Sequence, residues 1–319
     1  MTSVTVITAS YNSLKYLRDT IDSVVAQTMP PAEHIIVDDD STDGSYEFAI
    51  ELSENLTGLK LIKHDVNKGY PSALNTAISQ VKTDYLAILD SDDIAFPCWL
   101  EETCRVLDEN PDVGLVGGGA VIMTEGGVPT GEVKCTRFKG DVTEVILDGK
   151  YAVLHPGTVM RSELIRSIGG YHEYLKSAED KDMFINMASE SKIVNVGKPL
   201  IYYRRLRASE SKKTDVYYEA VKKYFLNKVS LLKEGRSVRE IDEILKGDVT
   251  ALQDLPRTRK PTKGEYDLEM AISFASGGKY MRSLFFLIRS SCLGKSPVSY
   301  FKFIAHLNLV KIHHFFKRG

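Results

Sequence analysis

The chain has 319 residues, of which 43% are hydrophobic and 26% charged, values typical of a soluble globular protein with one large or two smaller domains. Its formal net charge of -2 excludes a globally basic nucleic-acid binder, so no nucleic-acid partner is expected. The four cysteines have no C-x-x-C spacing, which argues against a zinc site and against a disulfide framework.

The N-terminal sequence MTSVTVITASYN leads directly into a strand-like pattern. It has no basic start and no long apolar core, so it does not resemble a signal peptide. No stretch approaches the roughly eighteen uncharged apolar residues that a membrane-spanning helix needs. We therefore expect a cytoplasmic protein whose cysteines are reduced.

Short β-rich apolar runs alternate with helix-length segments through about the first third of the chain. The predicted strands are residues 4–8, 35–37, 59–62 and 85–89, and the predicted helices are residues 14–27, 45–52, 71–81 and 97–109. Such alternation predicts an α/β fold with a parallel sheet between two layers of helices. In these sheets ligands bind beyond the carboxyl ends of the strands, where residues distant in sequence converge.

The second part of the chain changes character. Strands are still predicted at residues 116–123 and 194–196, and the segment SELIRSIGGY is helix-like. After about residue 208 the pattern becomes helical, rich in lysine and poor in glycine. There LEMAISFASGGKYMRSLFFLIRSSCL predicts two helices joined by a turn. We expect a first domain of residues 1–210 and a helical C-terminal region of residues 211–319.

Aspartates follow two of the predicted strands. Asp90, Asp92 and Asp93 end the segment YLAILDSDD, and a second acidic run follows the strand in IIVDDDSTDGS. Carboxylates this close repel one another unless a cation lies between them. Because both runs follow strands, they are expected to meet at the carboxyl edge of the sheet.

Two further motifs compete for the second acidic run. An EF-hand calcium loop beginning at Asp39 is excluded, because its twelfth position is Ile50, which cannot ligate. A phosphatase of the haloacid-dehalogenase type stays open: Asp38, Asp40 and Thr42 fit its D-x-D-x-T pattern, with an aspartate as nucleophile. In that case the DSDD segment would supply the further acidic pair that such enzymes need.

Simpler structural roles are expected for two other features. Asp43, before GSYEF, is expected to cap a helix. The glycine run at 117–119 lacks G-x-G-x-x-G spacing and is expected to mark close packing or a bulge.

Four segments occur in the order and at the spacings found in family 2 glycosyltransferases: VTVITASYN, IIVDDDSTDGS, NKGYPSALNTAI and YLAILDSDD. This resemblance covers roughly residues 3–205 and implies the GT-A fold, a Rossmann-like, mostly parallel sheet flanked by helices. It also implies a metal-dependent, inverting enzyme of polysaccharide biosynthesis. Such an enzyme moves a sugar from a nucleotide sugar, most often a UDP-sugar, to a hydroxyl of a saccharide or polyprenyl-linked saccharide.

The resemblance implies donor contacts for four residues. Tyr11 would stack on the base, and Thr8 would meet the edge of the base or the ribose. Asp39 would accept the N–H of uracil, which the ring nitrogen of cytosine cannot donate. Lys68, in a loop before a predicted helix, would meet phosphate charge.

The DSDD segment resembles the D-x-D motif of the family. On this mapping Asp92 ligates Mn²⁺ or Mg²⁺, and Asp90 contacts the ribose or a metal-bound water. Ser91, between them, belongs to the same nucleotide-sugar site, and Asp93 ligates as well or caps the next segment. A hard dication suits carboxylate and phosphate oxygens.

The acceptor side is expected in the second part of the chain. KSAEDKDMFINM resembles the E-D motif of the family, which implies that Glu179 and Asp180 lie at a helix start. Asp180 is therefore the expected general base, with Glu179 beside it. His155, in HPGTVMRSELIRSIGGY, is the expected acceptor contact. YYRRLRASES resembles the segment Y-R-x-H-x-x-S-x-S, but Leu206 stands where relatives have histidine, which weakens any expectation of metal affinity. Arg204 is expected to supply positive charge instead.

The C-terminal tail is basic and aromatic. The last fifty residues contain no acidic residue, and residues 295–319 carry five Lys or Arg and five aromatic residues. This pattern predicts peripheral contact with the inner face of the plasma membrane. A non-catalytic nucleotide-sugar-binding scaffold, with the helical region as its partner surface, stays open as an alternative from another class.

Overall fold

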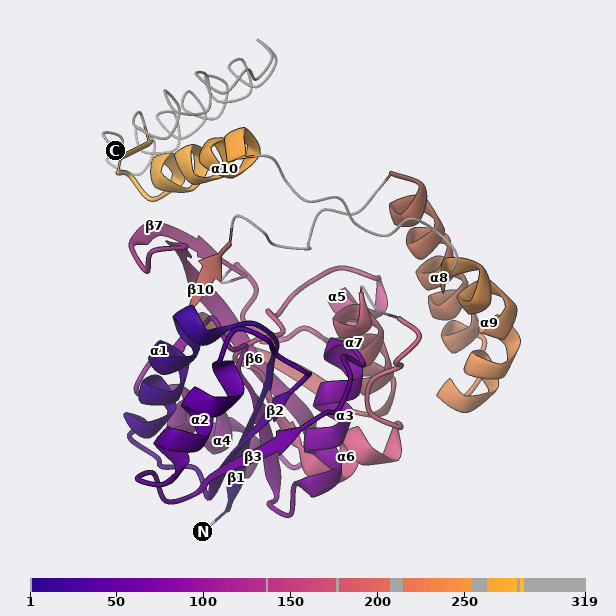
Figure 1. Ribbon diagram of the computed structural model, residues 1–319. Coiled ribbons are helices and arrows are strands. Elements are labelled where there is room, and N and C mark those ends of the chain that lie inside the picture. The colour runs from indigo at the N-terminus through magenta and orange to yellow at the C-terminus, as the bar shows by residue number, and fades with distance from the viewer. Residues whose placement is uncertain are drawn as a thin grey trace. The chain divides into compact units, whose positions relative to one another are not determined.

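The computed structural model describes residues 2–135, 137–175, 178–206, 215–253, 263–279 and 282–283 (Figure 1). The chain divides into two compact units. The first comprises Met1–Ala120, Cys135–Ile201 and Thr214–Arg257, and the second comprises Val121–Lys134, Tyr202–Lys213 and Thr258–Gly319. None of the helices in the described part combines the length and the apolar character that a bilayer crossing requires.

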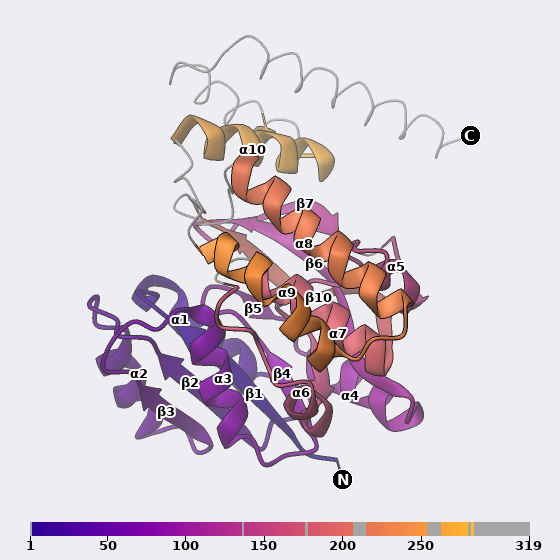
Figure 2. The same cartoon turned by 90° about the vertical axis from the view of Figure 1, so that its right-hand side faces the viewer.

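Helices and strands alternate along the first unit. Its helices are α1 (Leu14–Val25), α2 (Ser45–Ser53), α3 (Tyr70–Gln80), α4 (Trp99–Glu109), α5 (Thr143–Leu147), α6 (Ser162–Ser167), α7 (Glu179–Glu190), α8 (Asp215–Lys233) and α9 (Val238–Gln253). Its strands are β1 (Val4–Ser10), β2 (Glu33–Asp38), β3 (Leu59–Lys63), β4 (Tyr85–Ile88), β5 (Ile94–Ala95), β8 (Gly140–Asp141) and β9 (Val159–Arg161), with most of β6 (Val113–Thr124) and β10 (Lys192–Arg205). Helices α8 and α9 pack against each other, and α8 contacts α7 (Figure 2).

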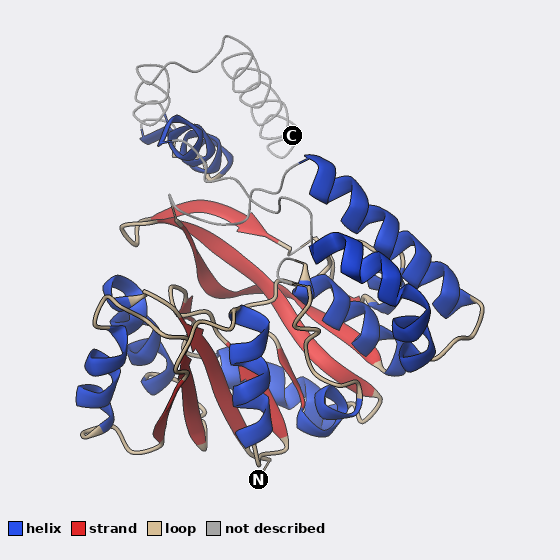
Figure 3. Cartoon of the chain, turned by 45° about the vertical axis from the view of Figure 1, so that its right-hand side comes forward, coloured by secondary structure: helices blue, strands red, loops and turns tan. Residues whose placement is uncertain are grey.

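The sheet of the first unit is mixed. Its strand order is β3-β2-β1-β4-β9-β6-β10-β5, and β8 pairs with β10. Strand β1 runs parallel to β2 and β4, and β2 runs parallel to β3, whereas β9 is antiparallel to β4 and β6. Figure 3 shows these strands as a layer with helices on both sides. The predicted α/β sheet between helices is confirmed, and its parallel part is β1 to β4. The antiparallel strands were not predicted, because a local apolar pattern does not encode strand direction.

The two faces of the sheet bury different helices, as the alternation along β2 shows. Ile35 and Val37 belong to the core cluster that contains Ala73 of α3. Ile36, between them, packs with Leu17 of α1 in a separate cluster. Because successive side chains of a strand point to opposite faces, α3 covers one face and α1 the other.

The glycine run in β6 allows close packing. A Cβ on Gly118 would lie 2.7 Å from Cδ1 of Leu200 and 2.8 Å from the backbone oxygen of Lys198. A Cβ on Gly117 would lie 2.9 Å from Cβ of Val153. The prediction of close packing at these glycines is confirmed.

The second unit contains β7 (Pro129–Lys134), which pairs with β6, and α10 (Lys263–Ser276), which packs on β7. Any side chain at Gly277 would collide with the backbone at Gly131, so this contact requires glycine. Helix α10 confirms the first helix of the predicted helix–turn–helix, and the second predicted helix lies outside the described residues apart from 282–283. The division into domains of 1–210 and 211–319 stays a prediction.

Candidate active site

The carboxyl ends of three parallel strands lie at the same edge of the sheet. The register pairs Ser10 of β1 with Asp38 of β2, and Ile7 of β1 with Ile88 of β4. The segments that follow these strands carry the predicted donor and metal residues. The structure therefore brings Tyr11, Asp39 and Asp90 to one edge.

Asp39 organises the loop before α3. It is 3% exposed, its Oδ1 accepts a hydrogen bond from the backbone N–H of Lys68 at 2.9 Å, and its Oδ2 accepts one from Gly69 at 2.7 Å. Nδ1 of His64 lies 2.6 Å from Oδ1 and must donate, because a carboxylate only accepts. Nε2 of His64 lies 2.9 Å from the hydroxyl oxygen of Thr76 on α3. His64 was not singled out from the sequence, since nothing local marks it as a partner of Asp39.

Thr8 and Tyr11 differ sharply in exposure. Thr8 is 0% exposed, and its hydroxyl donates to the backbone oxygen of Leu89 at 2.9 Å. Nε2 of His34 lies 3.0 Å from the same hydroxyl, and burial lowers the pKa of His34 to about 3, so this histidine is neutral. Tyr11 is 53% exposed at the end of β1. The contact of Thr8 with a base or ribose stays a prediction, and in this structure its hydroxyl serves the packing of β1.

Two other aspartates of the second acidic run have structural partners. Asp38 is 3% exposed, and its Oδ1 accepts a hydrogen bond from the backbone N–H of Ser41 at 2.9 Å. Asp43 accepts backbone N–H groups of Leu14 and Ser45, both at 3.0 Å, at the first residues of α1 and α2. The N-cap residue of α2 is Gly44 and not Asp43, so Asp43 supports the helix starts from one position before the cap.

A turn after β4 gathers three carboxylates. The backbone N–H of Asp93 donates to the backbone oxygen of Asp90 at 3.1 Å, and the hydroxyl of Thr20 on α1 donates to the backbone oxygen of Asp93 at 2.7 Å. Asp90, Asp92 and Asp93 each offer a carboxylate oxygen, and these atoms all lie within 4.8 Å of one another. Ser91 lies in the same turn and is partly buried. Three carboxylate oxygens in such a group fit a hard divalent cation such as Mn²⁺ or Mg²⁺.

Asp90 begins a chain of hydrogen-bonded side chains that come from distant parts of the sequence. The hydroxyl of Tyr70, at the start of α3, donates to Oδ1 of Asp90 at 2.5 Å and lies 3.4 Å from Nδ1 of His155. Nε2 of His155 lies 2.8 Å from the hydroxyl of Tyr171. His155 is 7% exposed, so its side chain is enclosed by two tyrosines. Its predicted contact with an acceptor stays a prediction, and its visible role is to order Tyr70 and Tyr171.

Asp180 lies on the first turn of α7 and acts electrostatically on this chain. Burial raises the pKa of Asp90, the charge of His155 and the hydrogen bond from Tyr70 lower it, and the charge of Asp180 raises it further. Oδ1 of Asp180 accepts hydrogen bonds from the backbone N–H of Lys181 at 2.7 Å and from the hydroxyl of Tyr151 at 3.2 Å. Glu179, partly buried, precedes it and also raises the pKa of Tyr171. The predicted base and the acidic turn are thus neighbours in space, although they come from different parts of the chain.

Lys68 and Arg204 are the two basic residues predicted to contact the donor. The side chain of Lys68 is exposed, and its backbone is held by Asp39. Arg204 belongs to the second unit, is 4% exposed and donates through Nη1 to the backbone oxygen of Glu125 at 3.1 Å. The predicted contacts of Lys68 and Arg204 with phosphate stay predictions.

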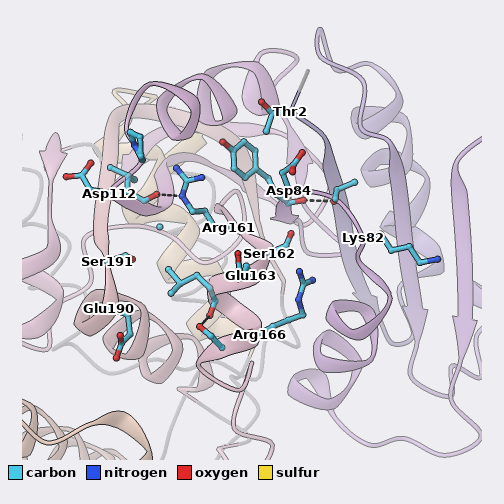
Figure 4. A pocket seen from close by; sticks show the side chains of 17 residues that line it. Thr2, Lys82, Asp84, Asp112, Arg161, Ser162, Glu163, Arg166, Glu190 and Ser191 are labelled. Atoms are coloured by element: carbon cyan, nitrogen blue, oxygen red, sulfur yellow. Dashed lines mark hydrogen bonds between the residues drawn. The ribbon is translucent and has the colours of Figure 1, made fainter.

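A cavity of about 730 Å³ lies at the opposite edge of the sheet, at the amino ends of β4 and β6 (Figure 4). Arg161, one of the basic residues that line it, donates hydrogen bonds to the backbone oxygens of Val113 and Leu107, at 2.9 Å and 2.8 Å. It therefore joins β9 to α4 and β6, and the cavity contains none of the predicted site residues.

Comparison with known proteins identifies a family and a relative that match much of the chain. Residues 5–157 match the family described as Glycosyl transferase family 2. A relative in Bacillus subtilis, named "Putative glycosyltransferase EpsE", is 30% identical over 191 residues, which cover 59% of this chain and 67% of the relative.

Solved structures show the same fold. The crystal structure of residues 1–349 of TarS from Staphylococcus aureus with UDP-GlcNAc superposes with a TM-score of 0.58 at 19% identity. The match covers 92% of this chain and 93% of TarS 1–349. The structure of the mannosyltransferase PcManGT from Pyrobaculum calidifontis with GDP-Man and Mn²⁺ has a TM-score of 0.52 at 16% identity, over 100% of this chain and 88% of PcManGT. The family match, the relative in B. subtilis and this GT-A fold together show that the chain belongs to glycosyl transferase family 2 and is a glycosyltransferase.

Proposed function

We propose that this glycosyltransferase is metal-dependent and inverting, and that it moves a sugar from a UDP-sugar to a hydroxyl of a saccharide or polyprenyl-linked saccharide. The observation that carries this proposal is the Asp90–Asp92–Asp93 turn, whose carboxylate oxygens all lie within 4.8 Å of one another. The effect of the charge of Asp180, on the first turn of α7, on the pKa of Asp90 supports it. A dication site beside a carboxylate base is the arrangement that transfer from a sugar diphosphate requires. Family membership removes the phosphatase alternative, and the enzyme class removes the non-catalytic scaffold.

The donor base is proposed to bind between Tyr11 and Asp39. Tyr11 offers an exposed ring for stacking at the end of β1. A carboxylate has about four acceptor positions, and the described contacts of Asp39 use three of them, two on Oδ1 and one on Oδ2. One position on Oδ2 is therefore available to the N–H of uracil. A UDP donor is also supported by the complexes of the related TarS with UDP and UDP-GlcNAc.

The metal is proposed to bind at the turn after β4. Asp92 would hold Mn²⁺ or Mg²⁺ together with Asp90 or Asp93, whose carboxylate oxygens lie within 4.8 Å of one another. When bound, the dication neutralises the negative charge of the diphosphate and of the departing UDP. Tyr70 fixes the orientation of the Asp90 carboxylate through its hydrogen bond.

Asp180 is proposed as the general base that accepts the proton of the acceptor hydroxyl. Tyr151 and the backbone of Lys181 both donate to Oδ1. These two hydrogen bonds hold the carboxylate through Oδ1, and Oδ2 is the oxygen proposed to accept the proton. One base acting in a single displacement inverts the configuration at the anomeric carbon, which is why we propose an inverting enzyme.

The test is a panel of nucleotide sugars incubated with the protein, with and without Mn²⁺, with release of the nucleoside diphosphate as the readout. UDP released only in the presence of Mn²⁺ or Mg²⁺ is the expected result. Release of GDP rather than UDP would contradict the donor assignment. Turnover that persists in the presence of a metal chelator would contradict the proposed metal dependence. The configuration of the product, measured by nuclear magnetic resonance, tests inversion.

A further inference from the structure

A buried pair of opposite charges lies next to Asp180 and has no part in the mechanism above. Asp182 is 1% exposed on the first turn of α7, and Lys228 of α8 is 0% exposed. Nζ of Lys228 donates to Oδ1 of Asp182 at 2.5 Å. Lysine is almost never fully buried unless its charge is paired, and removing one partner of such a pair is strongly unfavourable. This contact therefore fixes α8 to α7.

His172 and Asp242 complete the network. Nδ1 of His172 lies 2.7 Å from Oδ2 of Asp182, and its Nε2 lies 3.1 Å from Oδ2 of Asp242 on α9. Nζ of Lys228 lies 3.7 Å from Oδ1 of Asp242. Burial alone would lower the pKa of His172, but the two carboxylates raise it to about 9, so His172 is charged at neutral pH. Two cations and two anions then balance, and the network joins α7, α8, α9 and the loop at His172.

The start of α7 depends on such tertiary contacts. Its N-cap residue is Ala178, which has a φ of 83° and makes no side-chain cap hydrogen bond. Alanine has no group that can cap a helix, and a left-handed conformation strains a residue with a Cβ. Lys181, next to Asp180, also reaches α8, with its Nζ 4.7 Å from the ring centroid of Phe225. Contacts with the α8–α9 hairpin therefore set the position of the turn that carries Asp180.

We propose that the α8–α9 hairpin positions the catalytic base, with Lys228 acting through Asp182 to hold the first turn of α7 against the acceptor site. This inference rests on the proposed function, in which Asp180 is the base. Lys228, Asp182 and their partners are positioning residues, because they act through α7 and not on the substrate. The donor site does not depend on them, since Asp39 and Asp92 follow β2 and β4.

The experiment compares turnover with donor binding in Lys228→Met. Misplacing a catalytic group by a small distance is expected to lower kcat roughly ten- to a hundredfold at saturating donor and acceptor. The Kd for UDP in the presence of Mn²⁺ is expected to be unchanged, because Asp39 and Asp92 follow β2 and β4 and are not held by the α8–α9 hairpin. Lys228→Arg keeps the charge and is expected to restore most of the turnover. Lys222→Met is the matched control, because Lys222 is on the same helix with its side chain 57% exposed, and it is expected to behave as the parent.

Three outcomes would overturn the proposal. The first is a parental kcat in folded Lys228→Met, and the second is an equal loss of kcat and of UDP affinity. If Lys228→Met does not fold, Asp242→Asn decides, because Asp242 is 25% exposed and its loss leaves the pair of Lys228 and Asp182 in place. Asp242→Asn is expected to have a several-fold lower kcat with unchanged UDP affinity. A parental kcat in Asp242→Asn is the third outcome that would overturn the proposal.

Asp180→Asn, measured beside these variants, separates the two proposals. If it turns over like the parent, Asp180 is not the base, and both the proposed function and this inference fail. If it is inactive while Lys228→Met has parental kcat, only the positioning role fails.

Discussion

At the scale of single residues, the polar side chains of the proposed active site are held by other protein groups. Asp39 accepts three hydrogen bonds, and the Asp90 carboxylate is oriented by Tyr70. The hydrogen bonds fix the orientation of each carboxylate. Its remaining acceptor positions therefore point in defined directions. A substitution of aspartate by asparagine keeps the size of the side chain but turns an acceptor into a donor, so its effect can be assigned to one function.

Asp39→Asn is expected to weaken UDP binding by about 1–3 kcal/mol, the usual scale for a mispaired buried hydrogen bond. The amide would present N–H either to uracil or to the backbone N–H groups of Lys68 and Gly69. Calorimetric titration of UDP measures the change. Asp65→Asn, at an exposed position of the same loop, is the matched control. Equal UDP affinity in Asp39→Asn and the parent would remove Asp39 from the base site.

Asp92→Asn and Asp180→Asn are expected to fail in different ways. Asp92→Asn loses a charged ligand for a hard cation, so metal-dependent donor binding should be lost together with turnover. Asp180→Asn cannot accept a proton at neutral pH, so it should bind UDP and Mn²⁺ like the parent but transfer sugar roughly 10²–10⁴-fold more slowly. Titration of UDP with Mn²⁺ and the rate at saturating substrates separate the two effects. Near-parental turnover in Asp180→Asn would make Glu179 the next candidate for the base.

At the scale of elements, α7 connects the active site to the rest of the first unit. Its first turn carries Asp180, and the same turn carries Asp182, which is bound by Lys228 of α8. Burial raises the pKa of Asp182, but Lys228 and His172 lower it to about 2, so Asp182 is charged throughout the neutral range. The element that carries the proposed base is thus held through a carboxylate, Asp182, that does not titrate near pH 7.

His172 makes stability depend on pH above neutrality. Its pKa is raised from 6.5 to about 9 in the folded protein, so protonated His172 stabilises the fold. This contribution is complete below pH 6.5 and is lost as the pH rises through about 9, with an upper bound of roughly 3 kcal/mol. The charged groups around it are Asp182 of α7, Asp242 of α9 and Lys228 of α8.

Thermal unfolding between pH 6.5 and 9.5 measures this dependence. The parent is expected to lose stability across the range, and His172→Gln is expected to be less stable at pH 6.5 but flatter with pH. His34→Gln is a useful comparison, because burial lowers the pKa of His34 to about 3. The contribution of His34 therefore makes stability rise with pH near 6.5, opposite in sign to that of His172, and is constant at higher pH. A slope in His172→Gln as steep as in the parent would contradict the assignment to His172.

At the scale of the whole molecule, charge is distributed unevenly along the chain. The net charge is -2, yet the last fifty residues hold eight Lys or Arg residues and no acid. The basic and aromatic residues of 295–319 lie outside the described residues, so the peripheral membrane contact proposed for them stays a prediction. A membrane-bound, polyprenyl-linked acceptor would make such contact useful, because it holds the enzyme near its substrate.

Removal of residues 295–319 is expected to abolish sedimentation with anionic vesicles. Each basic residue near an anionic surface contributes about 1 kcal/mol, so the five in this segment are enough for reversible attachment. A full-length variant with Lys295, Lys302, Lys311, Lys317 and Arg318 changed to Gln keeps the aromatic residues and isolates the charge. Neutral vesicles are the second control. Unchanged binding of the shortened chain to anionic vesicles would leave the tail with a structural role or a protein partner.

The sequence by itself determined the local features of this protein. The alternation of apolar runs predicted β1 to β4 and the helices between them, because the side-chain periods of strands and helices are local properties. The position of aspartates after strands predicted that the acidic turn and Asp39 would meet at one edge, and the E-D segment predicted the start of α7. The first of these predictions needed only the rule that parallel strands end together, whereas the second came from the resemblance to the family.

The tertiary structure alone decided the partners of these residues. His64 for Asp39, Tyr70 for Asp90, and Lys228 for Asp182 come from other elements of the chain. A buried polar group must be paired, but which group pairs with it depends on strand register and helix packing over long sequence separations. Strand direction in β9 was decided in the same way, by pairing with β4 and β6. Local pattern therefore placed the reactive carboxylates, and long-range packing fixed their orientation.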